Sequence, residues 1–265
     1  MKKILIGGIC LLLLFTALAH EYILLAYKFK VAKGDMLELH LFVADGFNIE
    51  MERPMQTAIT TKFELINENG TSNLLSNISN GTLPIVNMKA DFDGLGLFNL
   101  ERGYAKNTMD TKKFMAYLKE DHIENITVSN DPNKTTQRER YTRYIKTLVH
   151  SGQEKADTLY KTITAQKFEI ILLQNPYLLH KGDKLNAQVF FMGRPLANKI
   201  ITARSRKGSE KATVALSRTN KNGICSFKIT NDGDWFLHAT NMIPSTDKND
   251  ADWESFWTSY SFGIN

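Results

Sequence analysis

The sequence predicts a predominantly β protein, made of two immunoglobulin-like or prealbumin-like β-sandwich domains with a helical insertion of about two helices between them. Three observations lead to this expectation. A stretch near the N-terminus recurs in the second half, short strands follow one another at the spacing of a sandwich, and two amphipathic segments separate the strand-rich halves. The chain has 265 residues, of which 43% are hydrophobic and 23% charged, so it can bury a core without metal or disulfide staples.

Residues 1–19 have the features of a secretory signal peptide: a basic start, an apolar run over 4–18, and the cleavage pattern Ala17-Leu18-Ala19. We expect cleavage after Ala19, localisation in the periplasm and no membrane span after signal cleavage. Cleavage removes Lys2 and Lys3, so the formal charge falls from +5 to +3. The mature chain lacks the clustered basic residues typical of proteins that bind nucleic acid. It keeps one cysteine, Cys225, which we expect to be a small buried residue.

The repeat compares residues 23–42, ILLAYKFKVAKGDMLELHLF, with residues 171–190, ILLQNPYLLHKGDKLNAQVF. Eight of twenty positions agree without a gap. Each copy predicts a strand, a turn at Lys-Gly-Asp and a second strand of period two, because Gly supplies the turn conformation and Asp can bond the backbone after it. The inward face of the second strand is expected to carry Leu37, Leu39 and Leu41 in one copy, and Leu185, Ala187 and Val189 in the other.

Strand patterns continue after both repeats. In the first half they cover 58–67, 84–92 and 96–101; in the second half they cover 199–205, 212–216, 224–229, 235–239 and 256–262. Between the halves, Thr111 to His122 and Thr136 to Val149 place apolar residues at helical spacing and predict two helices. The predicted division is a signal peptide (1–19), an N-terminal sandwich (20–107), a helical insertion and linker (108–165) and a C-terminal Ig-like sandwich (166–265).

No common catalytic signature occurs in the chain, neither a nucleophile elbow nor a zinc-protease helix nor a phosphate-binding glycine loop. This absence favours a protein that is not an enzyme.

His20 is the strongest candidate for chemistry, because cleavage after Ala19 makes it the first residue of the mature chain. An N-terminal histidine offers its α-amine and its ring Nδ1 to one metal ion, and the amine loses its proton easily near neutral pH. With one further imidazole the site becomes a three-nitrogen clamp suited to Cu²⁺ or Ni²⁺.

Three further residues are candidate metal ligands. His40 lies on the strand expected to pair with the strand that starts at His20, and Glu21 offers an oxygen. His238, in Trp235-Phe236-Leu237-His238-Ala239, joins them only if the two sandwiches fold towards one another. The acidic segment 250–254 offers carboxylates for a hard cation, although its alternation with Trp253 and Trp257 is also typical of a final strand against a core.

Several motifs together resemble the bacterial exported family called domain of unknown function 4198. They are the start His20-Glu21-Tyr22-Ile23-Leu24-Leu25, Lys33-Gly34-Asp35 with His40-Leu41-Phe42-Val43, the stretch Arg138 to Tyr144, Asn175-Pro176-Tyr177, Gly193-Arg194-Pro195-Leu196 and Ala251 to Trp257. The resemblance covers nearly the whole mature chain and implies a periplasmic metal-binding accessory linked to nickel and cobalt uptake. Many members of that family carry His before the Met that follows the Trp strand, where this chain has Asn241 before Met242.

We therefore expect a periplasmic protein that binds Ni²⁺, Co²⁺ or Cu²⁺ and buffers or delivers the ion for uptake, with an inner- or outer-membrane metal transporter as partner. Two alternatives stay open. One is a non-catalytic cell-envelope module for binding or adhesion, which uses the sandwiches only as a scaffold. The other is a copper oxidase with an N-terminal histidine clamp.

Overall fold

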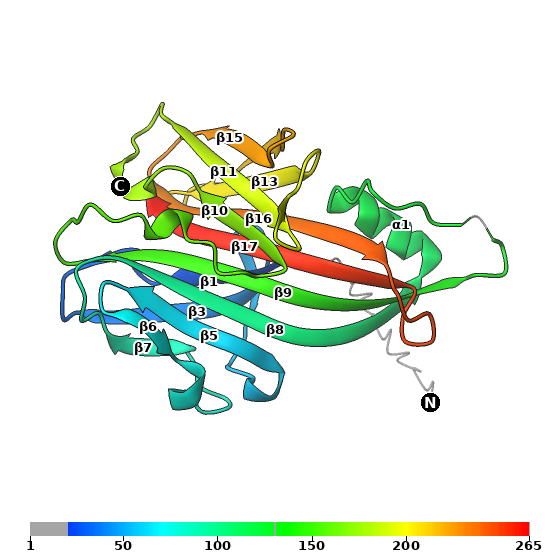
Figure 1. Cartoon of the computed structure of the whole chain (residues 1–265), viewed down its shortest axis with the longest axis horizontal. Helices are drawn as coiled ribbons and strands as arrows, with labels where there is room; N and C mark the ends of the chain where they lie inside the picture. Colours follow the sequence, from blue (N-terminus) through cyan, green and yellow to red (C-terminus); the bar gives the residue numbers. More distant parts are fainter. Residues whose placement is uncertain (1–20, 130, 265) are drawn as a thin grey trace, which may run out of the picture.

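Strands dominate the computed structural model, which describes residues 21–129 and 131–264. The described part contains three β-sheets, one α-helix and four short 3-10 helices (Figure 1). The 3-10 helices are Thr57–Ile59, Leu75–Asn77, Leu159–Lys161 and Pro176–Leu178. The predicted predominance of β structure is confirmed.

A nine-stranded sheet runs through the whole molecule and takes strands from both halves of the chain. Its order is β14-β13-β16-β17-β9-β8-β5-β6, and β2 also pairs with β9. The strands are β2 (Lys30–Val31), β5 (Thr60–Asn67), β6 (Gly70–Asn73), β8 (Gly94–Asp110), β9 (Thr136–Ser151), β13 (Ile200–Arg206), β14 (Thr213–Arg218), β16 (Gly233–Pro244) and β17 (Trp253–Ile264). The pairing of β17 with β9 is parallel and joins the two halves by backbone hydrogen bonds.

Two smaller sheets complete the fold. One contains β1 (Glu21–Ala26), β3 (Met36–Asp45), β4 (Asn48–Glu52) and β7 (Val86–Lys89); the other contains β10 (Phe168–Leu172), β11 (Lys184–Phe191), β12 (Arg194–Pro195) and β15 (Ile224–Lys228).

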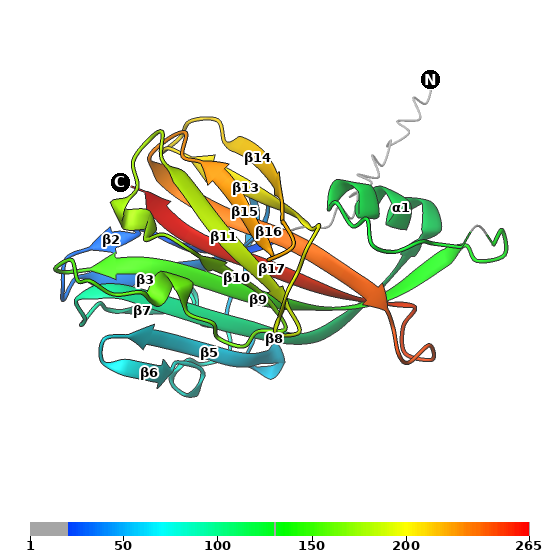
Figure 2. The same ribbon diagram turned by 45° about the horizontal axis from the view of Figure 1, so that its top comes forward.

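The two small sheets cover opposite faces of the long sheet. Successive side chains of a strand point to opposite faces, and the neighbours Lys146 and Thr147 of β9 reach different sheets. The Lys146 amine contacts Glu169 of β10, whereas the Thr147 hydroxyl donates to the carbonyl of Leu24 in β1, 2.6 Å away. The centre of the molecule is therefore a three-layered β structure, with β9 and β17 in the middle layer (Figure 2).

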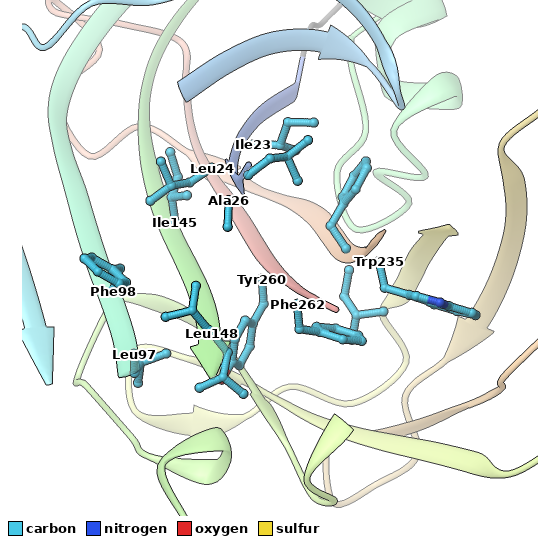
Figure 3. Close-up of a cluster of buried hydrophobic side chains, with 14 of the residues drawn as sticks. Ile23, Leu24, Ala26, Leu97, Phe98, Ile145, Leu148, Trp235, Tyr260 and Phe262 are labelled. Atoms are coloured by element: carbon cyan, nitrogen blue, oxygen red, sulfur yellow. The ribbon is translucent and has the colours of Figure 1, made fainter. Parts of the chain in front are cut away.

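A large hydrophobic core fills the space between these layers. It includes Ile23 and Leu24 of β1, Leu148 of β9 and Phe262 of β17, each exposed by less than 1%. Figure 3 shows these side chains meeting in one cluster. The predicted inward positions of both repeats also belong to this core.

The two Lys-Gly-Asp turns of the repeat are built alike. Gly34 and Gly182 have φ angles of +88° and +105°, in the region that favours glycine. Each glycine donates its amide to a neighbouring strand segment, to the carbonyls of Ala90 and Ile229 respectively, at 2.9 Å. The following aspartates, Asp35 and Asp183, accept a bond from the backbone amide three residues earlier. The predicted glycine conformation is confirmed, whereas the aspartates bond the backbone before them and not, as expected, the backbone after them.

The prediction of a second helix over Thr136 to Val149 is wrong, because this segment forms β9. Its apolar residues recur at helical spacing for another reason: from Tyr144 onwards the strand lies between two layers, so both of its faces are buried and strict alternation disappears. The β-branched Thr147 and Val149 suit a strand. Pairing with β8 and β17 then determines the conformation.

The first predicted helix is confirmed as α1 (Thr111–Glu120). The Asp110 side chain caps it by accepting from the amide of Lys112 at 2.8 Å. Phe114, Tyr117 and Leu118 pack in a separate small cluster with Met242 and Trp257. Met115 of the same helix is 49% exposed.

Cys225 is buried as predicted, and burial raises the pKa of its thiol to about 12. Within residues 21–129 and 131–264, no helix is long and apolar enough to cross a membrane.

Candidate functional site

The start of β1 meets β16 in a buried pair of predicted ligands. Glu21 Oε1 lies 2.7 Å from His238 Nε2, and the two residues are only 6% and 8% exposed. Glu21 comes from the N-terminal half and His238 from the C-terminal half, so the folding of one half against the other brings them together. His20, the preceding candidate, lies outside the described residues.

Glu21 is held as a carboxylate by further contacts. Its Oε2 accepts a bond from the amide of Gly46 at 3.1 Å, and Arg204 Nη2 lies 3.4 Å from its Oε1. Burial alone would raise the pKa of Glu21, but His238, Arg204 and the Gly46 amide outweigh burial and lower it. Gly46 has a φ of +64°, and a Cβ there would lie 2.7 Å from Arg204 Nη1. Glycine is therefore the residue that lets Arg204 approach.

Asp121 extends this group from the end of α1. Its Oδ2 accepts a bond from the Thr240 hydroxyl at 3.1 Å, two residues beyond His238 on β16. Burial raises the pKa of Asp121 to about 7, although His238 and Thr240 act in the opposite direction. We call Glu21, Asp121 and His238 the N-terminal polar cluster. A small pocket lined by Glu21, His238, Tyr22, Arg143 and Trp257 adjoins it.

Lys199 borders the cluster and donates to the carbonyl of His122 at 3.0 Å. Burial lowers the pKa of Lys199 to about 8, whereas Asp121 and Glu124 act to raise it. Sequence reasoning did not identify Asp121, Arg204 or Lys199. The only local signal is at Asp121, because an acid at the C-terminal end of a helix opposes the helix dipole and suggests another role.

His40 lies on β3, which pairs with β1 as predicted, but the structure does not bring it to Glu21. The register pairs Glu21 with Ala44 and Leu25 with His40, so the two are four residues apart, about 13 Å along the strand. His40 Nδ1 lies 2.7 Å from Glu52 Oε1, and its ring stacks on Phe42. These contacts account for His40 as a sheet histidine with acidic neighbours.

The carboxylates of the acidic segment 250–254 are engaged by cations. Asp252 lies 2.9 Å from Lys134 Nζ and 3.3 Å from Arg138 Nη2. Burial alone would raise the pKa of Asp252, but the Arg138 amide and these two cations lower it to about 2. Glu254 lies 2.5 Å from Arg140 Nη2 and also accepts from the Tyr104 hydroxyl. This segment is an ion-pair network that ties β17 to β9.

Over the ranges 21–129 and 131–264, no group of three His, Cys, Asp or Glu side chains is placed to hold a metal ion.

Fold and site together define a mostly β, layered sandwich protein with a buried polar cluster where its first described strand begins. The chain belongs to the family described as Domain of unknown function (DUF4198), whose model matches residues 17–243. That description assigns no activity, and the link to nickel and cobalt uptake stays a proposal. No curated protein matches the chain.

Solved structures similar to the chain include the "D0-D1 domain of Intimin", at 11% identity, covering 92% of this chain and 98% of that one, with a TM-score of 0.21. A second is the "tetra-tandem repeat in extending region of large adhesion protein", at 10% identity, covering 92% and 49%, also with a TM-score of 0.21. At such TM-scores these two likenesses carry no conclusion about function.

Proposed function

We propose that this protein is a periplasmic accessory that binds a transition-metal ion, Ni²⁺, Co²⁺ or Cu²⁺, and buffers or delivers it to a membrane transporter. The observation that supports the proposal is the buried pair of Glu21 and His238 at the residue that follows His20. His20 would supply its α-amine and Nδ1, and His238 the third nitrogen. In this proposal His238, rather than His40, supplies the further imidazole that the sequence analysis expected.

The donor chemistry suits such an ion. His238 Nε2 is shielded from solvent and has no hydrogen bond of good geometry, although Glu21 Oε1 is 2.7 Å away. A neutral imidazole and a carboxylate are both ordinary ligands of these metals. The pKa of Asp121 is raised to about 7, so below that pH its carboxyl adds no second negative charge. Without His20 the site has too few donors. Because the α-amine of His20 is free only when His20 is the first residue, the clamp depends on cleavage after Ala19.

The test is a calorimetric titration of the exported chain with Ni²⁺, Co²⁺ and Cu²⁺, after intact mass has established its first residue. We expect His20→Ala and His238→Gln each to lower affinity at least tenfold, which is about 1.4 kcal/mol. His40→Ala is the matched control and should bind like the wild type. Unchanged affinity in the first two variants would remove the proposal. Oxygen- or peroxide-dependent turnover found only with copper would indicate the oxidase instead.

A second candidate, a non-catalytic envelope module for binding or adhesion, is favoured by the edge strands. In the described sheets β4 pairs only with β3, and β14 only with β13. Both expose apolar side chains, with Ile49 and Met51 40% and 49% exposed, and Val214 and Leu216 56% and 53% exposed. Such edges are suited to adding a partner strand. A wild-type chain that starts at His20 and binds none of the three metals would put this candidate first.

A further inference from the structure

Three arginines gather beside the N-terminal polar cluster. Arg102 of β8 and Arg143 of β9 are direct partners in the sheet register, so their side chains leave the same face. Both guanidinium groups lie against the ring of Tyr22, with their Cζ atoms 5.2 Å and 4.0 Å from its centroid. Arg53, just after β4, is the third, and its charge acts on Arg102. We call Arg53, Arg102 and Arg143 the arginine cluster.

The positive charge of this cluster has no matching carboxylate. Arg102 is only 5% exposed; its Nη2 donates to Gln56 Oε1 at 2.6 Å, and its buried Nη1 has no partner. The buried Nε atoms of Arg53 and Arg143 also lack a partner. Within the part of the chain that the structure describes, none of these three arginines forms an ion pair.

Glu139 is the acidic residue whose pKa Arg143 affects, and its carboxylate already accepts other hydrogen bonds. Arg143 acts to lower the pKa of Glu139, but that carboxylate accepts bonds from the Tyr117 hydroxyl, at 3.0 Å, and from the Ser255 hydroxyl. Burial outweighs these contacts, so the pKa of Glu139 is raised. Glu139 forms no ion pair with Arg143 among those of the described residues, so it offsets the charge of the cluster only at a distance.

Aromatic contacts compensate for only part of this cost. Arg143 lies over the rings of Tyr22, Tyr141 and Trp257. A desolvated cation–π contact stabilises a buried cation by less than burial of its charge costs. Like charges placed directly opposite on a sheet add repulsion. Burial and the neighbouring arginines accordingly lower the pKa of Arg102. An anion would remove both penalties.

The local backbone is also irregular at this point. The register of β8 against β9 shifts between Arg102 and Ala105, and bulges of this kind redirect side chains and are common beside binding sites. Of the three arginines, Arg143 lines a small pocket, together with Tyr22 and Trp257 and with Glu21 and His238 of the N-terminal polar cluster.

We propose that the arginine cluster binds a small oxyanion, such as phosphate or sulfate, which accepts hydrogen bonds from the free N–H groups of Arg102, Arg143 and Arg53. Guanidinium groups present donors in a fixed planar fork that matches oxyanions, and several oxygens can satisfy several forks at once. Its ligand and its donor residues differ from those of the proposed metal site, although both sites adjoin the pocket lined by Glu21 and His238.

The experiment titrates the metal-free mature protein with inorganic phosphate, sulfate and acetate at constant ionic strength, with chloride as the reference. Tryptophan fluorescence is a suitable signal because Trp257 lies beside Arg143, and calorimetry gives the affinity. We expect saturable binding, weakened at least tenfold in Arg102→Gln and in Arg143→Gln. Arg194→Gln, at an exposed position of β12, should bind like the wild type. Tighter binding of phosphate than of acetate would assign a tetrahedral ligand.

Phosphatidylglycerol vesicles distinguish a lipid headgroup from a free ion. Sedimentation of the wild type, but not of Arg143→Gln, with vesicles would assign the headgroup as the source of the oxyanion. Absence of saturable binding by the wild type would overturn the proposal. Equal stabilisation of wild type and both variants by sulfate would overturn it too, because that is the general effect of an excluded salt. Circular dichroism identifies a variant that fails to fold, and Arg143→Gln, at a less buried position, then decides.

Discussion

Glu21 illustrates how several weak influences fix the state of one residue. Burial opposes its ionised form, while His238, Arg204 and one backbone amide favour it, and together they prevail. Asp121, in the same cluster, lacks a cation at ion-pair distance among the described residues, and burial prevails there instead. Two carboxyl groups of one cluster thus have pKa values shifted in opposite directions, and below about pH 7 Asp121 is mainly protonated while Glu21 is ionised.

The raised pKa of Asp121 predicts a dependence of stability on pH. Its carboxyl has a pKa of about 7 in the folded protein and an ordinary value of 3.8 when unfolded. Between about pH 4 and 7 the folded state binds the extra proton, so the free energy of unfolding falls as pH rises through that window. Asp121→Asn should remove this contribution. Urea denaturation of both proteins across the window measures it, and identical pH slopes would contradict the burial argument.

At the scale of elements, β9 best shows what the sequence can and cannot determine. Turns and amphipathic strands were predictable because Gly, Asp and period-two patterns act locally, as at Lys33-Gly34-Asp35. The strand conformation of β9 was not predictable, because both of its faces are buried only through contacts with two other layers of the fold. The same limit applies to the site. Glu21 and His238 could be named from the sequence because their side chains are common metal ligands, whereas Arg204 and Asp121 could not, because only long-range packing brings them to the site.

A buried ion pair between β9 and β10 predicts a large and asymmetric effect on stability. Lys146 and Glu169 are each 1% exposed in their side chains, and the lysine also donates to the carbonyls of Thr162 and Ile170. Burial lowers the pKa of Lys146 to about 8. Lys146→Met should destabilise the protein by about 3–5 kcal/mol because it strands the buried Glu169 charge.

The double variant Lys146→Met/Glu169→Leu is the control for that experiment. It removes both charges, so it should recover a substantial part of the loss, and chemical denaturation of the four proteins gives the coupling energy. Additive losses would mean that the two charges do not depend on each other.

For the molecule as a whole, the nine-stranded sheet predicts cooperative unfolding. Strands of the first half, such as β8 and β9, share backbone hydrogen bonds and one hydrophobic core with β16 and β17 of the second. The division at 107/108 and 165/166 expected from the sequence stays a prediction. We expect scanning calorimetry to give a single transition with equal calorimetric and van't Hoff enthalpies. Two separate transitions would show that the halves are independent thermodynamic domains.

The parallel pairing of β17 with β9 also has a consequence for biosynthesis. More than a hundred residues separate the two strands, and the ribosome completes β9 long before β17 exists. During that interval one side of β9 presents unpaired amides and carbonyls to any neighbouring strand, which is the situation that invites aggregation. A nascent chain of this design therefore depends on a holding chaperone, or on remaining extended, until its residues 253–264 have emerged.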